Sequence, residues 1–179
     1  REASAHGASL GLRINPQFST QTGHAIYDPC SKGSRLGITA ANFPETLPDW
    51  IEGLHFHTLC EQNSDALEAT LCAVEEKFGK HLKRIKWINL GGGHHITRAD
   101  YDIARLKRCI NKMADKYGLE VYLEPGEAVA LNAGELISEV LDIVENDGKI
   151  ALLDASAACH MPDVIEMPYT PPLANAGKP

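Results

Sequence analysis

Residues 86–97 read KWINLGGGHHIT, a short apolar run followed at once by three glycines and two histidines. Three successive glycines remove every Cβ from the end of a predicted strand, so a phosphate group could approach the backbone N–H groups closely. A flexible turn that serves only packing would look the same. The turn is neither a dinucleotide fingerprint, because Gly-x-Gly-x-x-Gly is absent, nor a P-loop, because no Gly-Lys-Ser/Thr follows.

Strand and helix patterns alternate on both sides of this turn. Residues 53–58 (GLHFHT) alternate in a way that predicts a buried strand, and residues 120–123 (EVYL) predict another. A helix is expected between them from Ser64, as N-cap, to about Gly79, and a second over 103–117, closed by Gly118. Strand, helix, strand, helix, strand is typical of βαβ units and a parallel sheet.

The flanking segments extend this pattern and then change it. Residues 10–15 predict another strand, and 16–37 a long loop of the kind that is usually functional or disordered. Residues 136–144 fit a strand or a helix. The turn signal at 146–148 and a strand at 149–153 predict a β-rich continuation. We therefore expect one unit over 1–127 and the start of another over 128–179.

Composition limits the possible functions. The 179 residues carry 17 Lys and Arg against 24 Asp and Glu, a net charge of −7, which argues against a nucleic-acid footprint. No apolar run approaches the ~20 residues of a membrane span, and the first residues show no signal peptide. Five widely spaced cysteines without a Cys-x-x-Cys pair favour reduced thiols, and hence a cytoplasmic protein.

Unusual residues follow three successive predicted strands, at the edge where α/β proteins bind ligands. His55 and His57 are two apart on the predicted strand and should share a face, where they could hold a metal or lie against a flat ring. Of the adjacent His94 and His95, at most one can face a ligand. Glu124 could bind a metal, take a proton or pair with a protonated ring nitrogen.

Two further groups of residues carry weaker signals. Glu127 adds a second acidic side chain beside Glu124, which suits a cationic substrate. Cys159, His160 and Asp163 could form a thiol–imidazole arrangement, although a structural cysteine fits the same pattern.

Four segments together resemble the carboxynorspermidine decarboxylase branch of the fold-III pyridoxal-phosphate decarboxylases. They are 53–62 (GLHFHTLCEQ), 89–97 (NLGGGHHIT), 124–128 (EPGEA) and 154–169 (DASAACHMPDVIEMPY). The resemblance implies an α/β fold, the second half of a (β/α)8 barrel continuing into a β-rich C-terminal domain. It also implies a homodimer with active sites at the subunit interface, and decarboxylation of carboxynorspermidine or carboxyspermidine to norspermidine or spermidine.

The resemblance further implies roles for individual residues. His57 would stack on the pyridine ring of pyridoxal 5′-phosphate, and Gly91, Gly92 and Gly93 would bind its phosphate. Glu124 would pair with the pyridine nitrogen. Acidic residues, Glu127 and Asp163, would bind the polyamine substrate.

Some family features are not found in this sequence. No lysine here matches the Schiff-base lysine, which we expect upstream, and the catalytic cysteine is expected downstream. The chain thus resembles an internal part of the enzyme, inactive by itself. Two alternatives stay open: a metal-dependent hydrolase that uses His55 and His57, and a non-catalytic barrel that only binds pyridoxal phosphate.

Overall fold

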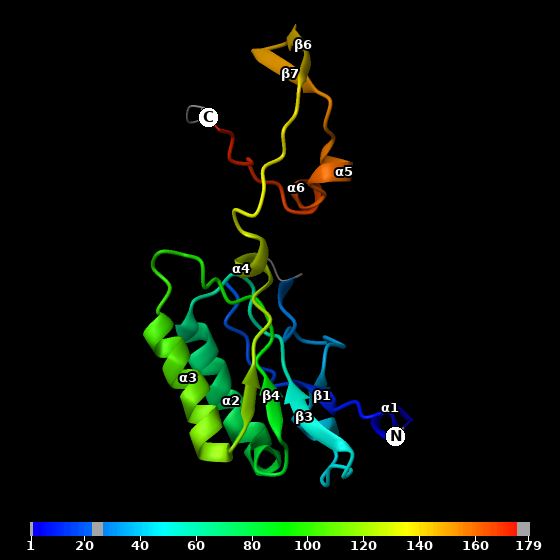
Figure 1. Cartoon of the computed structure of the whole chain (residues 1–179), viewed down its shortest axis with the longest axis vertical. Coiled ribbons are helices and arrows are strands. Elements are labelled where there is room, and N and C mark those ends of the chain that lie inside the picture. Colours follow the sequence, from blue (N-terminus) through cyan, green and yellow to red (C-terminus); the bar gives the residue numbers. More distant parts are fainter. Residues whose placement is uncertain (1, 23–26, 175–179) are drawn as a thin grey trace. The chain divides into compact units, whose positions relative to one another are not determined.

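A computed structural model describes residues 2–22 and 27–174 and divides the chain into two compact units, Arg1–Ala133 and Gly134–Pro179 (Figure 1). The elements of the first unit are α1 (Glu2–Ala5), β1 (Leu10–Asn15), β2 (Ile38–Thr39), the 3-10 helix η2 (Ala40–Asn42), β3 (Ile51–His55), α2 (Ser64–Leu82), β4 (Trp87–Asn89), α3 (Ile103–Tyr117), β5 (Glu120–Tyr122) and α4 (Gly126–Ala130).

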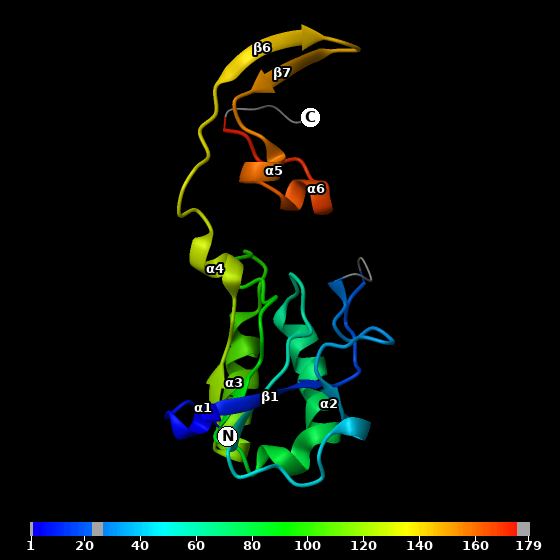
Figure 2. The same cartoon turned by 90° about the vertical axis from the view of Figure 1, so that its right-hand side faces the viewer.

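The first unit is built on a parallel sheet in the order β2-β1-β3-β4-β5. Helices α2 and α3 lie beside one another against this sheet, as Figures 1 and 2 show. The register aligns one row of side chains across four strands near their carboxyl ends, namely Arg13, His55, Asn89 and Tyr122. The expected parallel βα arrangement is thus confirmed.

The core lies between the sheet and the two helices. Because successive strand residues point to opposite faces, Leu54 and Ile88 face the helices while Gly53, His55 and Trp87 face the other way. The fully buried side chains include Leu54, Phe56, Ile88 and Leu90 from the sheet side, Leu67, Leu71, Val74 and Phe78 from α2, and Met113 from α3. These apolar positions are the ones whose spacing predicted the helices.

Helix α2 differs at both ends from the expectation. Its N-cap is Asn63, whose side chain accepts a hydrogen bond from the Ser64 N–H. Ser64 is not the cap, and its hydroxyl donates to the Asp102 carbonyl at 2.8 Å. The helix also continues past Gly79 to Leu82, which is fully buried. Tertiary packing therefore overrides the local stop signal.

Helix α3 follows the expectation at both ends. It spans Ile103–Tyr117, and Gly118 ends it in the left-handed conformation with φ +70°. This is the geometry that favours glycine just after a helix.

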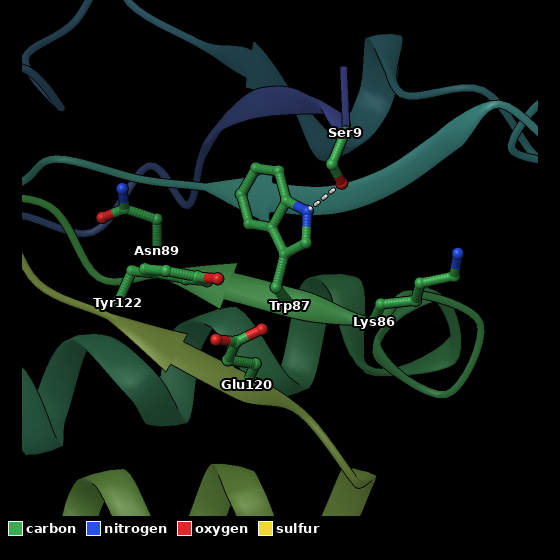
Figure 3. A pocket seen from close by; sticks show the side chains of 6 residues that line it. All are labelled: Ser9, Lys86, Trp87, Asn89, Glu120 and Tyr122. Carbon is green, nitrogen blue, oxygen red and sulfur yellow. Dashed lines mark hydrogen bonds between the residues drawn. The ribbon is translucent and has the colours of Figure 1, made fainter. Parts of the chain in front are cut away.

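On the sheet face away from the helices, one tryptophan covers two glycines. A Cβ added to Gly53 would lie 2.0 Å from the Trp87 indole, and one added to Gly11 would lie 2.3 Å from it. The indole Nε1 donates to the Ser9 hydroxyl at 2.7 Å (Figure 3). Beside it lies a hollow of about 420 Å³ whose lining is Ser9, Lys86, Trp87, Asn89, Glu120 and Tyr122.

The second unit consists of a hairpin and two short helices. Strands β6 (Val140–Glu145) and β7 (Lys149–Leu153) pair antiparallel, followed by α5 (Ala157–His160) and α6 (Asp163–Glu166). The ambiguous segment 136–144 therefore ends in a strand, and the turn predicted at 146–148 is confirmed, with Asp147 and Gly148 both at positive φ. Across the described residues of both units, no helix is long and apolar enough to cross a membrane.

Candidate functional site

The candidate site lies where β3, β4 and β5 end side by side. His55 is the last residue of β3, and Glu124 follows β5 by two residues. His55 Nε2 lies 3.7 Å from Glu124 Oε2, and His57 Nδ1 lies 4.0 Å from the same oxygen. The expected strand over 53–58 is wrong at its end, because β3 stops at His55. His57 therefore sits in the following loop, yet both imidazoles still face Glu124.

The glycine turn packs directly against these side chains. Gly91 and Gly93 have φ of +73° and +76°, and Cβ atoms there would lie 2.3 Å from the Phe56 carbonyl oxygen and 2.1 Å from that of Leu59. A Cβ on Gly92 would lie 2.7 Å from the Glu124 carbonyl oxygen and 3.0 Å from the His57 ring. The turn thus needs all three glycines to fit between the segments that follow β3 and β5.

One asparagine connects the turn to the carboxylate. Asn89 Nδ2 donates to Glu124 Oε1 at 2.8 Å, and Asn89 Oδ1 accepts from the Gly91 N–H at 2.8 Å. The Gly92 N–H donates to His57 Nδ1 at 3.3 Å. Sequence reasoning missed the role of Asn89, although a polar side chain at the end of an apolar strand was a usable signal.

Arg13 is a second residue that the sequence alone did not single out. It pairs in register with His55 from β1, and its Nη2 donates to the His57 carbonyl at 3.3 Å. Its Nε is buried without a hydrogen-bond partner among the residues that the structure describes. Side chains alternate between the two faces of the sheet along β1, and this places Arg13 on the same face as His55. Arg13 lies beside the histidines because β1 is the neighbour of β3 in the sheet.

The electrostatic surroundings favour neutral imidazoles. Burial lowers the pKa of His55 and of His57, and the positive charge of Arg13 lowers both further, while Glu124 opposes the change. Both rings are therefore mostly uncharged at neutral pH. A neutral aromatic ring can lie flat against another ring without introducing a second positive charge.

The adjacent histidines of the 94–95 pair have different surroundings. His94 is buried, with Nε2 3.3 Å from the Leu90 carbonyl oxygen, and burial lowers its pKa. His95 Nε2 lies 2.8 Å from Glu127 Oε2, and the Thr97 hydroxyl donates to the other oxygen of Glu127 at 3.2 Å. Glu127, near the start of α4, is therefore tied to the loop that follows the glycine turn.

The remaining candidate residues belong to the second unit. Asp163 accepts a hydrogen bond from the Tyr169 hydroxyl at 2.9 Å. The thiol of Cys159 is exposed, and His160 Nδ1 accepts from the Ser156 N–H at 3.2 Å. The side chains of Asp163 and His160 are thus held by neighbours within the same short stretch of chain.

The site in the first unit combines groups suited to two kinds of ligand. Backbone amides at a glycine turn, a neutral imidazole and a carboxylate suit a phosphorylated aromatic heterocycle. The ligand atoms of His55, His57 and Glu124 also lie within 4.8 Å of one another, a spacing that suits a metal ion. The sequence analysis had left both kinds of ligand open for His55 and His57.

Comparison with known proteins bears on which of these ligands the site is built for. No family model matches the chain. The chain is 52% identical over 168 residues to a carboxynorspermidine/carboxyspermidine decarboxylase of Campylobacter jejuni, which covers 94% of this chain and 44% of that protein. It is 44% identical over 172 residues to a carboxyaminopropylagmatine decarboxylase of a Synechocystis species, again over 94% of this chain and 44% of the relative.

A solved structure agrees with the sequence similarity. The carboxynorspermidine decarboxylase of Campylobacter jejuni, crystallised with norspermidine, matches this chain with a TM-score of 0.81 and 50% identity. The match covers 94% of this chain and 43% of that structure. The chain therefore spans less than half the length of the decarboxylases that it matches.

Proposed function

We propose that the protein to which this chain belongs is a pyridoxal-phosphate-dependent decarboxylase of carboxylated polyamines, and that this chain contributes much of its cofactor site. The observation that carries the proposal is the meeting of three groups at one point. Gly92 lies so close to the His57 ring and to the Glu124 backbone that a Cβ would contact both. The decarboxylase relatives favour this function over a metal-dependent hydrolase and over a purely binding barrel.

The residues present fit the cofactor. Pyridoxal 5′-phosphate, the cofactor that the sequence resemblance implies, offers a phosphate, an aromatic ring and a ring nitrogen. The glycine turn leaves the Gly93 N–H without a partner among the described residues, so it can donate to the phosphate. His57 supplies a flat neutral ring, and Glu124 supplies a half-exposed carboxylate. Each part of the cofactor thus has a matching group.

Each residue then has a defined task. When bound, the cofactor supplies an electron sink for the charge left as carbon dioxide departs. Glu124 holds a proton on the pyridine nitrogen, and Asn89 fixes the carboxylate for this task. The His57 ring orients the cofactor and shields one of its faces from water. Arg13 favours the uncharged form of that ring.

The substrate class follows from charge. A carboxylated polyamine carries several ammonium groups, so acidic side chains around the site would bind it. We propose Glu127 and Asp163 for this role, with the net charge of −7 as support. Carboxynorspermidine and carboxyspermidine are the expected substrates, and the Synechocystis relative adds carboxyaminopropylagmatine as a third compound to test.

Assembly and location are further parts of the proposal. We propose that residues 1–127 form part of a (β/α)8 barrel, that 128–179 begin a β-rich domain, and that active sites form at a homodimer interface. The five cysteines are free in the part of the chain that the structure describes, which supports a cytoplasmic location.

The test measures carbon dioxide release by the complete protein, loaded with pyridoxal 5′-phosphate, from each of the three compounds. We expect release from at least one of them, and a loss of most turnover in Glu124→Gln. Glu76→Gln, on the exposed side of α2, is the matched control. No release from any of the three, or full turnover in Glu124→Gln, would contradict the proposal.

A further inference from the structure

His55, His57 and Glu124 form a ligand set of a second chemical class. Two imidazole nitrogens and one carboxylate oxygen are the protein ligands of many open zinc sites, which complete their tetrahedral coordination with water. We propose that these three residues bind a zinc ion when no cofactor occupies the site, and that zinc and cofactor exclude one another. This goes beyond the proposed function, which gives the site no metal.

The two carboxylate oxygens of Glu124 have different neighbours, an arrangement that suits a metal. Oε1 accepts from Asn89 at 2.8 Å, which leaves Oε2 facing the two imidazoles at 3.7 and 4.0 Å. Zinc bonds of about 2.0–2.1 Å place neighbouring ligand atoms roughly 3.4 Å apart in a tetrahedral site. The three ligand atoms, which lie within 4.8 Å of one another, would therefore have to approach more closely, and this requires the two imidazoles to move as well as Glu124. Asn89 then acts as the outer partner that orients a ligating carboxylate.

A second observation points to the same place. His55 Nε2 is buried and has no hydrogen-bond partner among the described residues. A buried nitrogen without a partner indicates a missing ligand or ion. His57 Nδ1 accepts only a long hydrogen bond of 3.3 Å from Gly92, which a metal can replace at small cost.

Mutual exclusion follows from shared atoms. A zinc ion would take Glu124 Oε2 and one nitrogen of His57, the same groups that the proposed cofactor site uses. A cofactor ring stacked on His57 would in turn fill the space in front of the carboxylate. Zinc should therefore bind the cofactor-free protein and delay its loading.

The test begins with cofactor-free protein. Zinc is titrated against a chromophoric chelator, and cobalt(II) is added separately to read coordination from its visible absorption. We expect one zinc per chain and an intense cobalt band typical of tetrahedral coordination. His55→Gln, His57→Gln and Glu124→Gln should each weaken zinc binding at least tenfold. His6→Gln, at an exposed turn, is the matched control and should bind as the parent does. Circular dichroism checks that each variant is folded.

The second step tests exclusion. Protein loaded with pyridoxal 5′-phosphate is freed of excess cofactor by gel filtration, because free cofactor itself binds zinc, and is then titrated again. We expect the stoichiometric zinc site to be lost. Absence of one-to-one binding, zinc affinity unchanged in the three variants, or zinc binding equally well to loaded protein would overturn the proposal. Because the first titration contains no cofactor, its result is independent of the proposed function.

Discussion

Asn89 joins Glu124 to the glycine turn, with a 2.8 Å hydrogen bond on each side of one amide group. Its Nδ2 holds the carboxylate and its Oδ1 holds the Gly91 N–H. Two groups proposed to bind opposite ends of the cofactor are thereby fixed relative to each other by a single side chain. Such a connection makes the site rigid before the ligand arrives.

Replacement of Asn89 by aspartate separates the two contacts. Aspartate keeps an acceptor for Gly91 but cannot donate to Glu124 and adds a like charge beside it. A hydrogen bond to a charged group contributes about 1.5–3 kcal/mol, so cofactor affinity should fall roughly tenfold or more. Equilibrium binding of pyridoxal 5′-phosphate, followed by its absorbance, measures the loss. Asn42→Asp, at an exposed residue of η2, is the control. Equal affinity in Asn89→Asp and the parent would refute the role of Asn89.

The second prediction concerns the packing of Trp87 on Gly53. A Cβ on Gly53 would lie 2.0 Å from the indole, so Gly53→Ala must push the ring off the sheet. In a Trp50→Phe background, Trp87 is the remaining tryptophan of the sequence, and its emission should shift to the red. We also expect a loss of about 1–3 kcal/mol in the free energy of unfolding, typical of overpacking.

A glycine elsewhere provides the control for this substitution. Gly79 lies inside α2, and a Cβ there would meet only the Tyr117 hydroxyl at 4.0 Å. Gly79→Ala should therefore be neutral or stabilise the helix by up to about 1 kcal/mol. If Gly53→Ala behaved like Gly79→Ala, the indole would not lie where the structure places it.

Most of the fold and part of the site could be predicted from local sequence patterns. The spacing of Leu67, Leu71, Val74 and Phe78 defines the buried face of α2, and Gly118 ends α3 as its position suggests. These features depend on neighbours within one or two turns of the chain. The glycine turn and Glu124 were visible because unusual residues followed apolar strands.

The missed features depend on contacts between distant segments. Gly79 stays helical because the buried Leu82 beyond it holds the last turn against the core, which no local signal reveals. Arg13 reaches the site because β1 lies next to β3 in the sheet, although the two strands are far apart along the chain. Asn89 acquires its role only when β5 places Glu124 beside it. Strand order, rather than any motif, assembles these contacts.

The third prediction concerns substrate binding by Glu127. Glu127→Gln removes a negative charge next to His95 and Thr97 but leaves His57 and the glycine turn unchanged. Affinity of the complete, cofactor-loaded protein for norspermidine should fall about fivefold or more, while cofactor affinity should change little. Calorimetric titration of each ligand gives the two values. An equal loss for both ligands would mean that Glu127 supports the site as a whole and does not select the polyamine.

The fourth prediction concerns Glu75, which fastens α2 to α3. Its carboxylate accepts from the Lys116 ammonium at 2.7 Å and from the Tyr117 hydroxyl at 2.9 Å, and it also pairs with Lys112. Burial raises the pKa of Glu75, but the hydrogen bonds from these three residues outweigh it and lower the pKa from 4.5 to about 2. The ionised form is therefore the one that stabilises the folded state.

The sign of the pH dependence follows from this depressed pKa. The contribution of Glu75 is complete above the unfolded value of 4.5 and is lost as the pH falls towards 2. Glu75→Gln should lower the free energy of unfolding at pH 7 by about 0.5–1.5 kcal/mol, because it weakens the hydrogen bonds that the largely covered carboxylate accepts, while the two lysines stay solvated. Urea unfolding between pH 7 and pH 3 should show the gap between variant and parent narrowing below pH 4.5. The neighbouring exposed residue gives the control Glu76→Gln, for which we expect almost no gap at pH 7. A gap for Glu75→Gln that stayed constant down to pH 3 would show that the packing of the side chain, and not its charge, holds the two helices together.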